Sequence, residues 1–171
     1  MTDMTTNTRA TWALPALSVN TLMLILLGGA AGTLAFDIFG RALSPILGFS
    51  SLAPVGLARG FLGSLGLPNG AAYGHLMHLF FVGALAYPIG WLYVARPALS
   101  KIVPNMHWIA TSAVYGVGLW VFAIGGIAAF AGNPAFLNFT QITWVALVGH
   151  VFYAIVAAAT ITYLERLQTR N

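Results

Sequence analysis

Four long apolar stretches limit what this chain can fold into more than any other feature of its sequence. They lie at about residues 19–40, 72–94, 107–131 and 141–163. Each is long enough to cross the hydrocarbon core of a bilayer as a helix, which needs about 20 mostly apolar residues. Because the bilayer offers no water to the backbone, a spanning segment must satisfy its hydrogen bonds internally. The sequence therefore predicts four transmembrane α-helices.

The composition agrees with an all-α polytopic membrane protein. Of the 171 residues, 59% are hydrophobic and only 6% are charged, whereas a soluble domain carries about 25% charged residues. The seven Lys and Arg residues are scattered singly, and the lack of a basic patch argues against a nucleic-acid partner. The chain has no cysteine, which excludes disulfides and thiolate metal sites. The partner that the composition does indicate is the lipid bilayer.

The distribution of positive charge predicts the orientation in the membrane. We expect one four-helix transmembrane domain over residues 19–165, with an N-terminal tail at 1–18 and a C-terminal tail at 166–171. Lys and Arg favour the cytoplasmic side. With both tails in the cytoplasm, five of the seven cations fall on that side, and only Arg41 and Arg59 fall outside. We therefore expect a protein of the bacterial inner (cytoplasmic) membrane with both termini cytoplasmic.

The first connection, at about 41–71, is long and apolar but is broken by Gly and Pro. Pro45 and Pro54 each fall where the first turn of a helix would accept proline. We expect short helices or turns over 45–49 and 54–65 that lie in the outer membrane interface.

Ionisable side chains gather at the outer ends of the predicted spans. His78 and His150 lie about six and nine residues into spans that run in the same direction, so their depths differ by about 4–5 Å at about 1.5 Å per residue. His75 lies one turn nearer the surface. Asp37 ends the first span on the same side, and Arg41 follows it by four residues. The sequence therefore predicts one polar layer in the outer half of the membrane.

Hydrogen bonding within the protein is the first explanation for these histidines. Histidine side chains in membrane bundles bond across helices to backbone and hydroxyl groups. The candidate hydroxyl partners are Tyr73, Tyr153 and Thr143. On this interpretation no cofactor is bound.

A cofactor is the second explanation. His78 and His150, with His75 as a further candidate, could ligate haem b or another tetrapyrrole, since neutral imidazoles on facing helices can bind a porphyrin metal. Asp37 could accept the other ring N–H and orient the ligand. The third explanation is a nonhaem metal held by the three histidines and Asp37, or a role in proton transfer.

Two shorter patterns predict helix contacts. Asp37 and Arg41, spaced i,i+4 with the acid first, predict a local ion pair. Gly28 and Gly32 form a Gly-x-x-x-Gly motif, which is typical of close helix packing either within a bundle or with a neighbouring subunit.

Three stretches resemble small bacterial four-span inner-membrane proteins of unassigned function: "AAYGHLMHLFFVGALAYPIGWLY", "HWIATSAVYGVGLW" and "VGHVFYAIVAAATITYLE". Those proteins place a His near the start of the second span, a His-Trp pair at the start of the third, and Gly-His-x-x-Tyr in the fourth. The resemblance covers roughly residues 71–165. It implies the fold and the location, and it brings no active site with it.

The sequence does not support the common enzyme classes. It has no phosphate-binding Gly-Lys motif, nucleophile elbow or His-Glu-x-x-His motif. The three carboxylates, Asp3, Asp37 and Glu165, are far apart in the chain. We therefore expect a non-enzymatic accessory or structural subunit that packs against other membrane subunits or against itself. The alternative is a haem-binding electron-transfer protein that uses the histidines of the second and fourth spans.

The orientation can be tested with reporter fusions. A fluorescent reporter fused after Asn171 should mature in the cytoplasm, and a phosphatase reporter inserted near Asn69 should be active outside. The reason is that most Lys and Arg residues lie on the side of the two termini, and positive residues favour the cytoplasm. The reverse pattern would contradict the predicted orientation.

Overall fold

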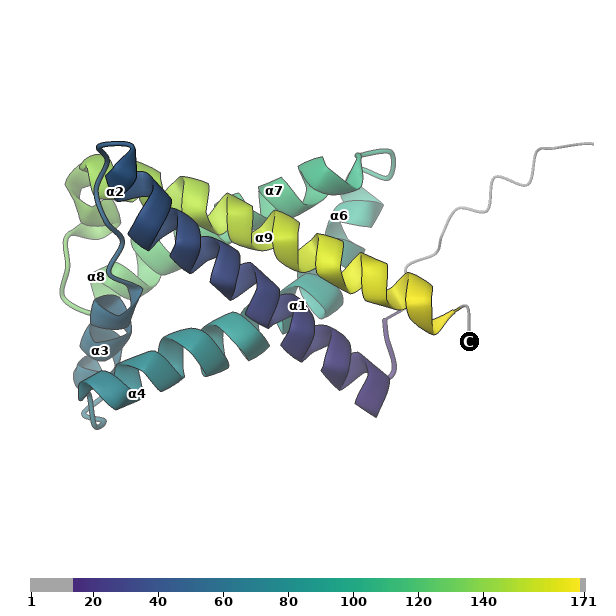
Figure 1. The fold of residues 1–171 in the computed structure, drawn as a ribbon, viewed down its shortest axis with the longest axis horizontal. Coiled ribbons are helices and arrows are strands. Elements are labelled where there is room, and N and C mark those ends of the chain that lie inside the picture. Colours follow the sequence, from purple (N-terminus) through teal and green to yellow (C-terminus); the bar gives the residue numbers. More distant parts are fainter. Residues whose placement is uncertain (1–13, 170–171) are drawn as a thin grey trace, which may run out of the picture.

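The computed structural model describes residues 14–169 and is all-helical, with four long helices that are apolar enough to cross a membrane (Figure 1). The four helical stretches are Val19–Ile46, Ala71–Ile102, Trp108–Phe130 and Gln141–Gln168. The predicted all-α architecture with four spans is confirmed. Most of the predicted N-terminal tail lies outside the described residues, and the last helix runs on into the predicted C-terminal tail as far as Gln168.

The first two spans contain wide π-helical turns. The first consists of α1 (Val19–Ile38), η1 (Phe39–Leu43) and α2 (Ser44–Ile46). The second consists of α4 (Ala71–His75), η2 (Leu76–Ala86), α5 (Tyr87–Gly90), η3 (Trp91–Ala95) and α6 (Arg96–Ile102).

These π turns allow proline to remain inside a span. Proline has no N–H, and its ring clashes with the carbonyl four residues earlier in an α-helix. Pro45, Pro88 and Pro97 each follow a π segment. Before Pro88, for example, the N–H of Tyr87 bonds to the carbonyl of Val82, five residues back, which widens the turn.

Two expectations about helix ends are therefore corrected. Pro45 was expected to begin a separate interfacial helix, but it lies in the last turn of the first span. The second span was expected to end near residue 94, but its helix continues through Pro97 to Ile102.

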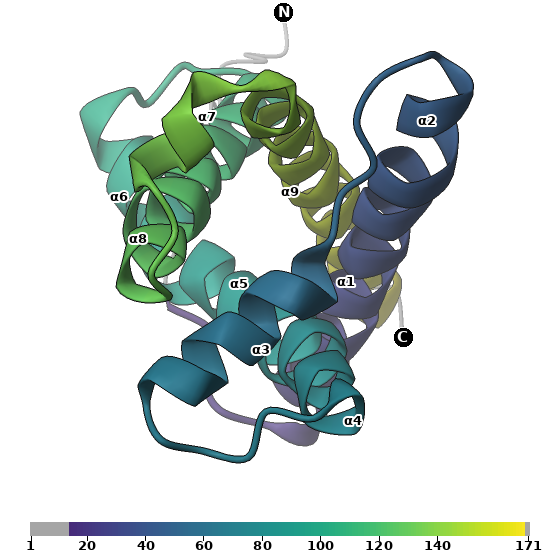
Figure 2. The same ribbon diagram turned by 90° about the vertical axis from the view of Figure 1, so that its left-hand side faces the viewer.

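The other predicted short helix is present. It is α3 (Pro54–Ser64), which packs against α4, η2 and the end of the third span. It buries Ala58 and Leu62 and crosses the end of the bundle (Figure 2). The third and fourth spans are α7 (Trp108–Trp120), η4 (Val121–Ile127) and α8 (Ala128–Phe130), then α9 (Gln141–Gln168).

The short segment η5 (Ala135–Phe139), which joins the last two spans, has an unusual backbone. Its residues from Phe136 to Phe139 all have positive φ, from 48° to 55°, a conformation that costs a non-glycine residue about 1–2 kcal/mol. The Thr143 hydroxyl donates to the Phe136 carbonyl at 2.6 Å. The Phe136 ring also fills the space above Gly125, where a Cβ would lie 2.6 Å from it. These contacts hold η5 over the C-terminal end of the third span.

Glycines on α1 bring it close to α9 (Figures 1 and 2). A Cβ at Gly28 would lie 2.5 Å from Ile161 Cγ1, and one at Gly32 would lie 2.9 Å from the Tyr153 ring. The predicted Gly-x-x-x-Gly contact is therefore internal to the bundle. Gly29 faces the second span instead, where a Cβ would lie 2.6 Å from the Gly83 carbonyl oxygen.

Substitution of Gly29 tests this packing. Gly29→Ala should lower the thermal unfolding temperature in detergent, because the added methyl meets backbone atoms of Gly83 and Ala84, and overpacking typically costs about 1–3 kcal/mol. Gly56→Ala is the matched control, since Gly56 is exposed and a Cβ there would meet only Ala53 Cβ, at 3.9 Å. Equal unfolding temperatures for the two variants would contradict the close approach of α1 and η2.

Candidate functional site

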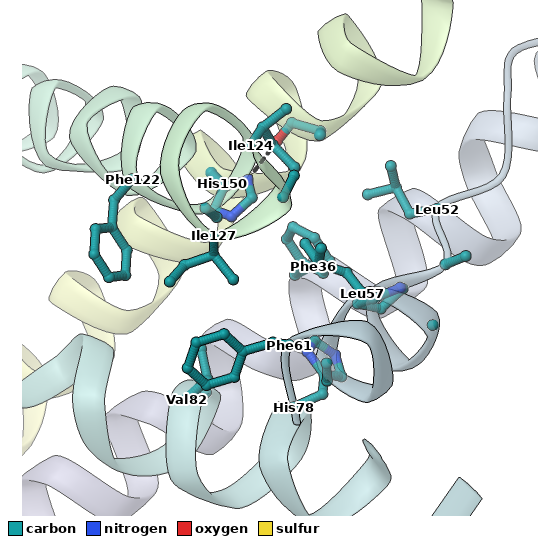
Figure 3. Close-up of a pocket in the computed structure, with 18 of the residues that line it drawn as sticks. Phe36, Leu52, Leu57, Phe61, His78, Val82, Phe122, Ile124, Ile127 and His150 are labelled. Atoms are coloured by element: carbon teal, nitrogen blue, oxygen red, sulfur yellow. Dashed lines mark hydrogen bonds between the residues drawn. The ribbon is translucent and has the colours of Figure 1, made fainter. Parts of the chain in front are cut away.

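A cavity of about 620 Å³ lies between the spans, at the end of the bundle that α3 crosses. All four spans, α3 and η5 contribute to its wall, which is mostly apolar. Figure 3 shows Phe36, Leu57, Val82 and Ile124 around it, together with His78 and His150. Cavities of about 300–1,000 Å³ hold small-molecule ligands in other proteins, so the volume suits such a ligand.

His78, on η2, is hydrogen-bonded to the first span. Its Nε2 lies 3.1 Å from Oδ1 of Asp37, and the two side chains are only 11% and 17% exposed. An ionised carboxylate can only accept, so Nε2 carries the proton. Asp37 also pairs with Arg41, but at 3.9 Å and with the Arg41 side chain 52% exposed. The predicted i,i+4 pair is therefore present, and His78 is the closer and more buried partner of Asp37.

His150, on α9, is buried and bonds to its own helix. Its Nδ1 lies 2.7 Å from the carbonyl oxygen of Ala146, one turn earlier. Because a carbonyl oxygen only accepts, Nδ1 must carry the proton, and the Nε2 of the neutral ring is left as an acceptor. Among residues 14–169, no group bonds to this Nε2, and packing does not seal it off from the cavity.

Three residues with hydroxyl groups also line the cavity. Thr33 donates to the Gly29 carbonyl at 2.8 Å, and Tyr153 donates to the Gly83 carbonyl at 2.6 Å. The Tyr87 ring lies 6.2 Å from the His150 ring, centroid to centroid. Within the described part of the chain, the Tyr87 hydroxyl has no hydrogen-bond partner.

The structure brings two of the three predicted histidines together. The Phe36 ring contacts both His78 and His150, at centroid distances of 5.9 Å and 5.1 Å. His75 is exposed on the outside of the bundle and does not line the cavity. The shared depth of His78 and His150 therefore corresponds to one shared cavity.

Other site expectations are corrected. Tyr153 and Thr143 were expected as partners for the histidines, but both donate to backbone carbonyls, and Tyr73 is exposed. Within residues 14–169, no three His, Asp or Glu side chains gather closely enough to hold a metal ion, so the predicted nonhaem metal site does not form.

Sequence reasoning missed Tyr87 and Phe36 as cavity residues. Tyr87 carried a usable signal, because it is a polar aromatic residue in the middle of a span and directly precedes Pro88. Phe36 carried none, because one phenylalanine in an apolar stretch does not show which way it faces.

Comparison with known proteins finds no matching family model, no matching curated sequence and no matching solved structure. The role of the cavity must therefore be inferred from its own geometry.

The Asp37–His78 hydrogen bond can be tested by removing its acceptor. Asp37→Ala should lower the free energy of unfolding by about 1–3 kcal/mol, because the largely buried His78 N–H loses its partner. Arg41→Ala should cost at most about 1 kcal/mol, as exposed ion pairs do. Reversible unfolding in mixed detergent micelles measures both. A larger loss for Arg41→Ala would show that the surface pair, and not His78, holds Asp37.

Proposed function

We propose that this multi-pass membrane protein is non-enzymatic and holds a lipid-soluble small molecule between its four spans. The observation that carries this proposal is the apolar cavity of about 620 Å³, with the Nε2 of buried His150 on its wall and without a partner among residues 14–169. A large apolar pocket with a few convergent polar groups is the usual form of a small-molecule site. We further propose that the protein lies in the bacterial inner membrane with both termini in the cytoplasm.

The placement of the carboxylates supports a binding role over catalysis. Asp37 is engaged by His78 and Arg41. Glu165 pairs with Arg96 at 2.8 Å near the opposite end of the bundle. Among residues 14–169, no two carboxylates therefore share a site, as paired acid–base catalysis would need.

Haem b is the second candidate ligand, with electron transfer as its function. It is supported by the way His150 is held, since a histidine that binds a metal commonly donates its other ring N–H to a carbonyl or carboxylate oxygen. His78 is oriented by Asp37 in the same manner. Both rings line the cavity.

The accessory-subunit role is supported by the lipid-facing side of the third span. Gly118 and Gly126 are exposed there, and a Cβ at either would meet nothing within 4 Å. Small residues on a membrane helix allow another helix to approach closely. We propose that a further membrane subunit or a second copy of this chain packs on this side.

Native mass spectrometry of the protein in lipid nanodiscs tests these proposals together. The wild type should carry an extra small-molecule mass. A Soret band in the same sample would identify haem, and added chains would identify subunits. Val82→Phe should reduce the fraction carrying the small molecule, because Val82 lines the cavity. Val94→Phe is the matched control, since Val94 is exposed on η3 and lies outside the cavity. A wild type without bound mass, or equal occupancy in the two variants, would contradict a ligand site.

A further inference from the structure

Most of the hydrogen atoms on polar side chains around the cavity are donated to acceptors within the protein. His150 Nδ1, the Thr33 hydroxyl and the Tyr153 hydroxyl all donate to backbone carbonyls. His78 Nε2 donates to Asp37. Asn133, which also lines the cavity, uses one amide hydrogen on the Ala128 carbonyl. What these groups chiefly present to the cavity is lone pairs.

One of these lone pairs belongs to the buried residue His150 and has no partner among the described residues. The residue is only 5% exposed, and its Nε2 has no partner within the part of the chain that the structure describes. Leaving a buried acceptor unsatisfied costs about 1–3 kcal/mol. A ligand that offers a hydrogen-bond donor at this point would remove that cost.

Tyr87 adds a second requirement. Its hydroxyl also lacks a partner among the described residues, and its ring lies near that of His150. This hydroxyl can donate as well as accept. The ligand group that best suits the pair therefore donates to His150 and accepts from Tyr87, and an alcohol or phenol hydroxyl does both.

We infer that the molecule held in the cavity is a lipid-soluble compound with a hydroxyl group, which donates a hydrogen bond to Nε2 of His150. The inference rests on the proposed ligand-binding function and adds the chemical class of the ligand. The apolar wall formed by residues such as Val82, Phe122 and Ile127 receives the rest of the molecule (Figure 3). A wholly apolar molecule, or one with only a carbonyl or ether oxygen, would leave Nε2 unsatisfied.

A matched pair of probes measures how much the hydroxyl group of the ligand contributes to binding. Tritiated para-hexylphenol and para-hexyltoluene differ only in a hydroxyl against a methyl group of similar size. Binding of each is measured to the full chain in nanodiscs, and partition into empty nanodiscs is subtracted. The wild type should bind the phenol about tenfold more tightly, the ratio expected from one hydrogen bond to a buried acceptor.

Variants assign that preference to His150. His150→Leu should bind the two probes equally, and His150→Gln, whose amide oxygen can accept, should recover part of the preference. Tyr87→Phe should reduce it. His75→Leu is the control, because His75 is exposed outside the cavity, and it should keep the wild-type ratio.

The outcomes separate this inference from the function on which it rests. Saturable but equal binding of both probes to the wild type would overturn the hydroxyl assignment and leave the cavity as a binding site. A full preference in a folded His150→Leu protein would overturn the role of His150. Absence of saturable binding for either probe would overturn the proposed function together with the inference. If His150→Leu fails to assemble, the wild-type ratio and the Tyr87→Phe variant still decide.

Discussion

A polar hydrogen inside a bilayer must find its acceptor within the protein, and the rest of this structure depends on that constraint. In the spans, backbone carbonyls are the main acceptors, and Asp37 accepts from His78. Among the described residues, the buried Trp91 indole N–H and the Tyr93 hydroxyl are the exceptions that have no partner. Tyr153 reaches Gly83, Tyr115 reaches the carbonyl of Tyr87, and the Trp120 indole reaches Thr143. Each bond fixes one helix against another or holds a side chain on its own helix. Around the cavity, most of these hydrogens point to backbone carbonyls, so mainly oxygen and nitrogen lone pairs remain on its wall. The polarity of the cavity therefore follows from the hydrogen bonds within the bundle.

The position of the cavity follows from where the helices can approach closely. Glycine allows close contact of α1 with α9, of α1 with η2, and of α7 with α9, where a Cβ at Gly116 would lie 2.6 Å from Val151 Cα. The second and third spans meet where the Tyr115 hydroxyl sits over Gly90, and they diverge toward the end that α3 bridges (Figure 1). Within the described residues, no glycine contact draws η2 against η4. The space left between these two segments forms much of the cavity.

Much of the fold could be predicted from the sequence, but less of the site could. Apolar length alone defines four spans, and the rise per residue places His78 and His150 at a common depth. Depth does not give the rotation of a helix about its axis, so the sequence could not show that Tyr153 bonds to a carbonyl and not to a histidine. The helix ends predicted from the prolines were wrong for a related reason. Pro45 and Pro97 predict helix ends when an α-helix is assumed, whereas a π turn before each removes the clash.

The competing interpretations of His150 reduce to one question, which is what occupies Nε2. Its Nδ1 proton is committed to Ala146, so the ring offers the cavity an electron pair and no hydrogen. A leucine of similar bulk would fill the same space without leaving a polar atom to satisfy. The imidazole therefore costs free energy unless an electron-pair acceptor meets it, and a hydroxyl hydrogen, a water hydrogen or a haem iron each fits that description. Shape alone would admit any apolar molecule of the right volume. The lone pair of His150, in the first half of α9, is what gives the cavity a chemical preference.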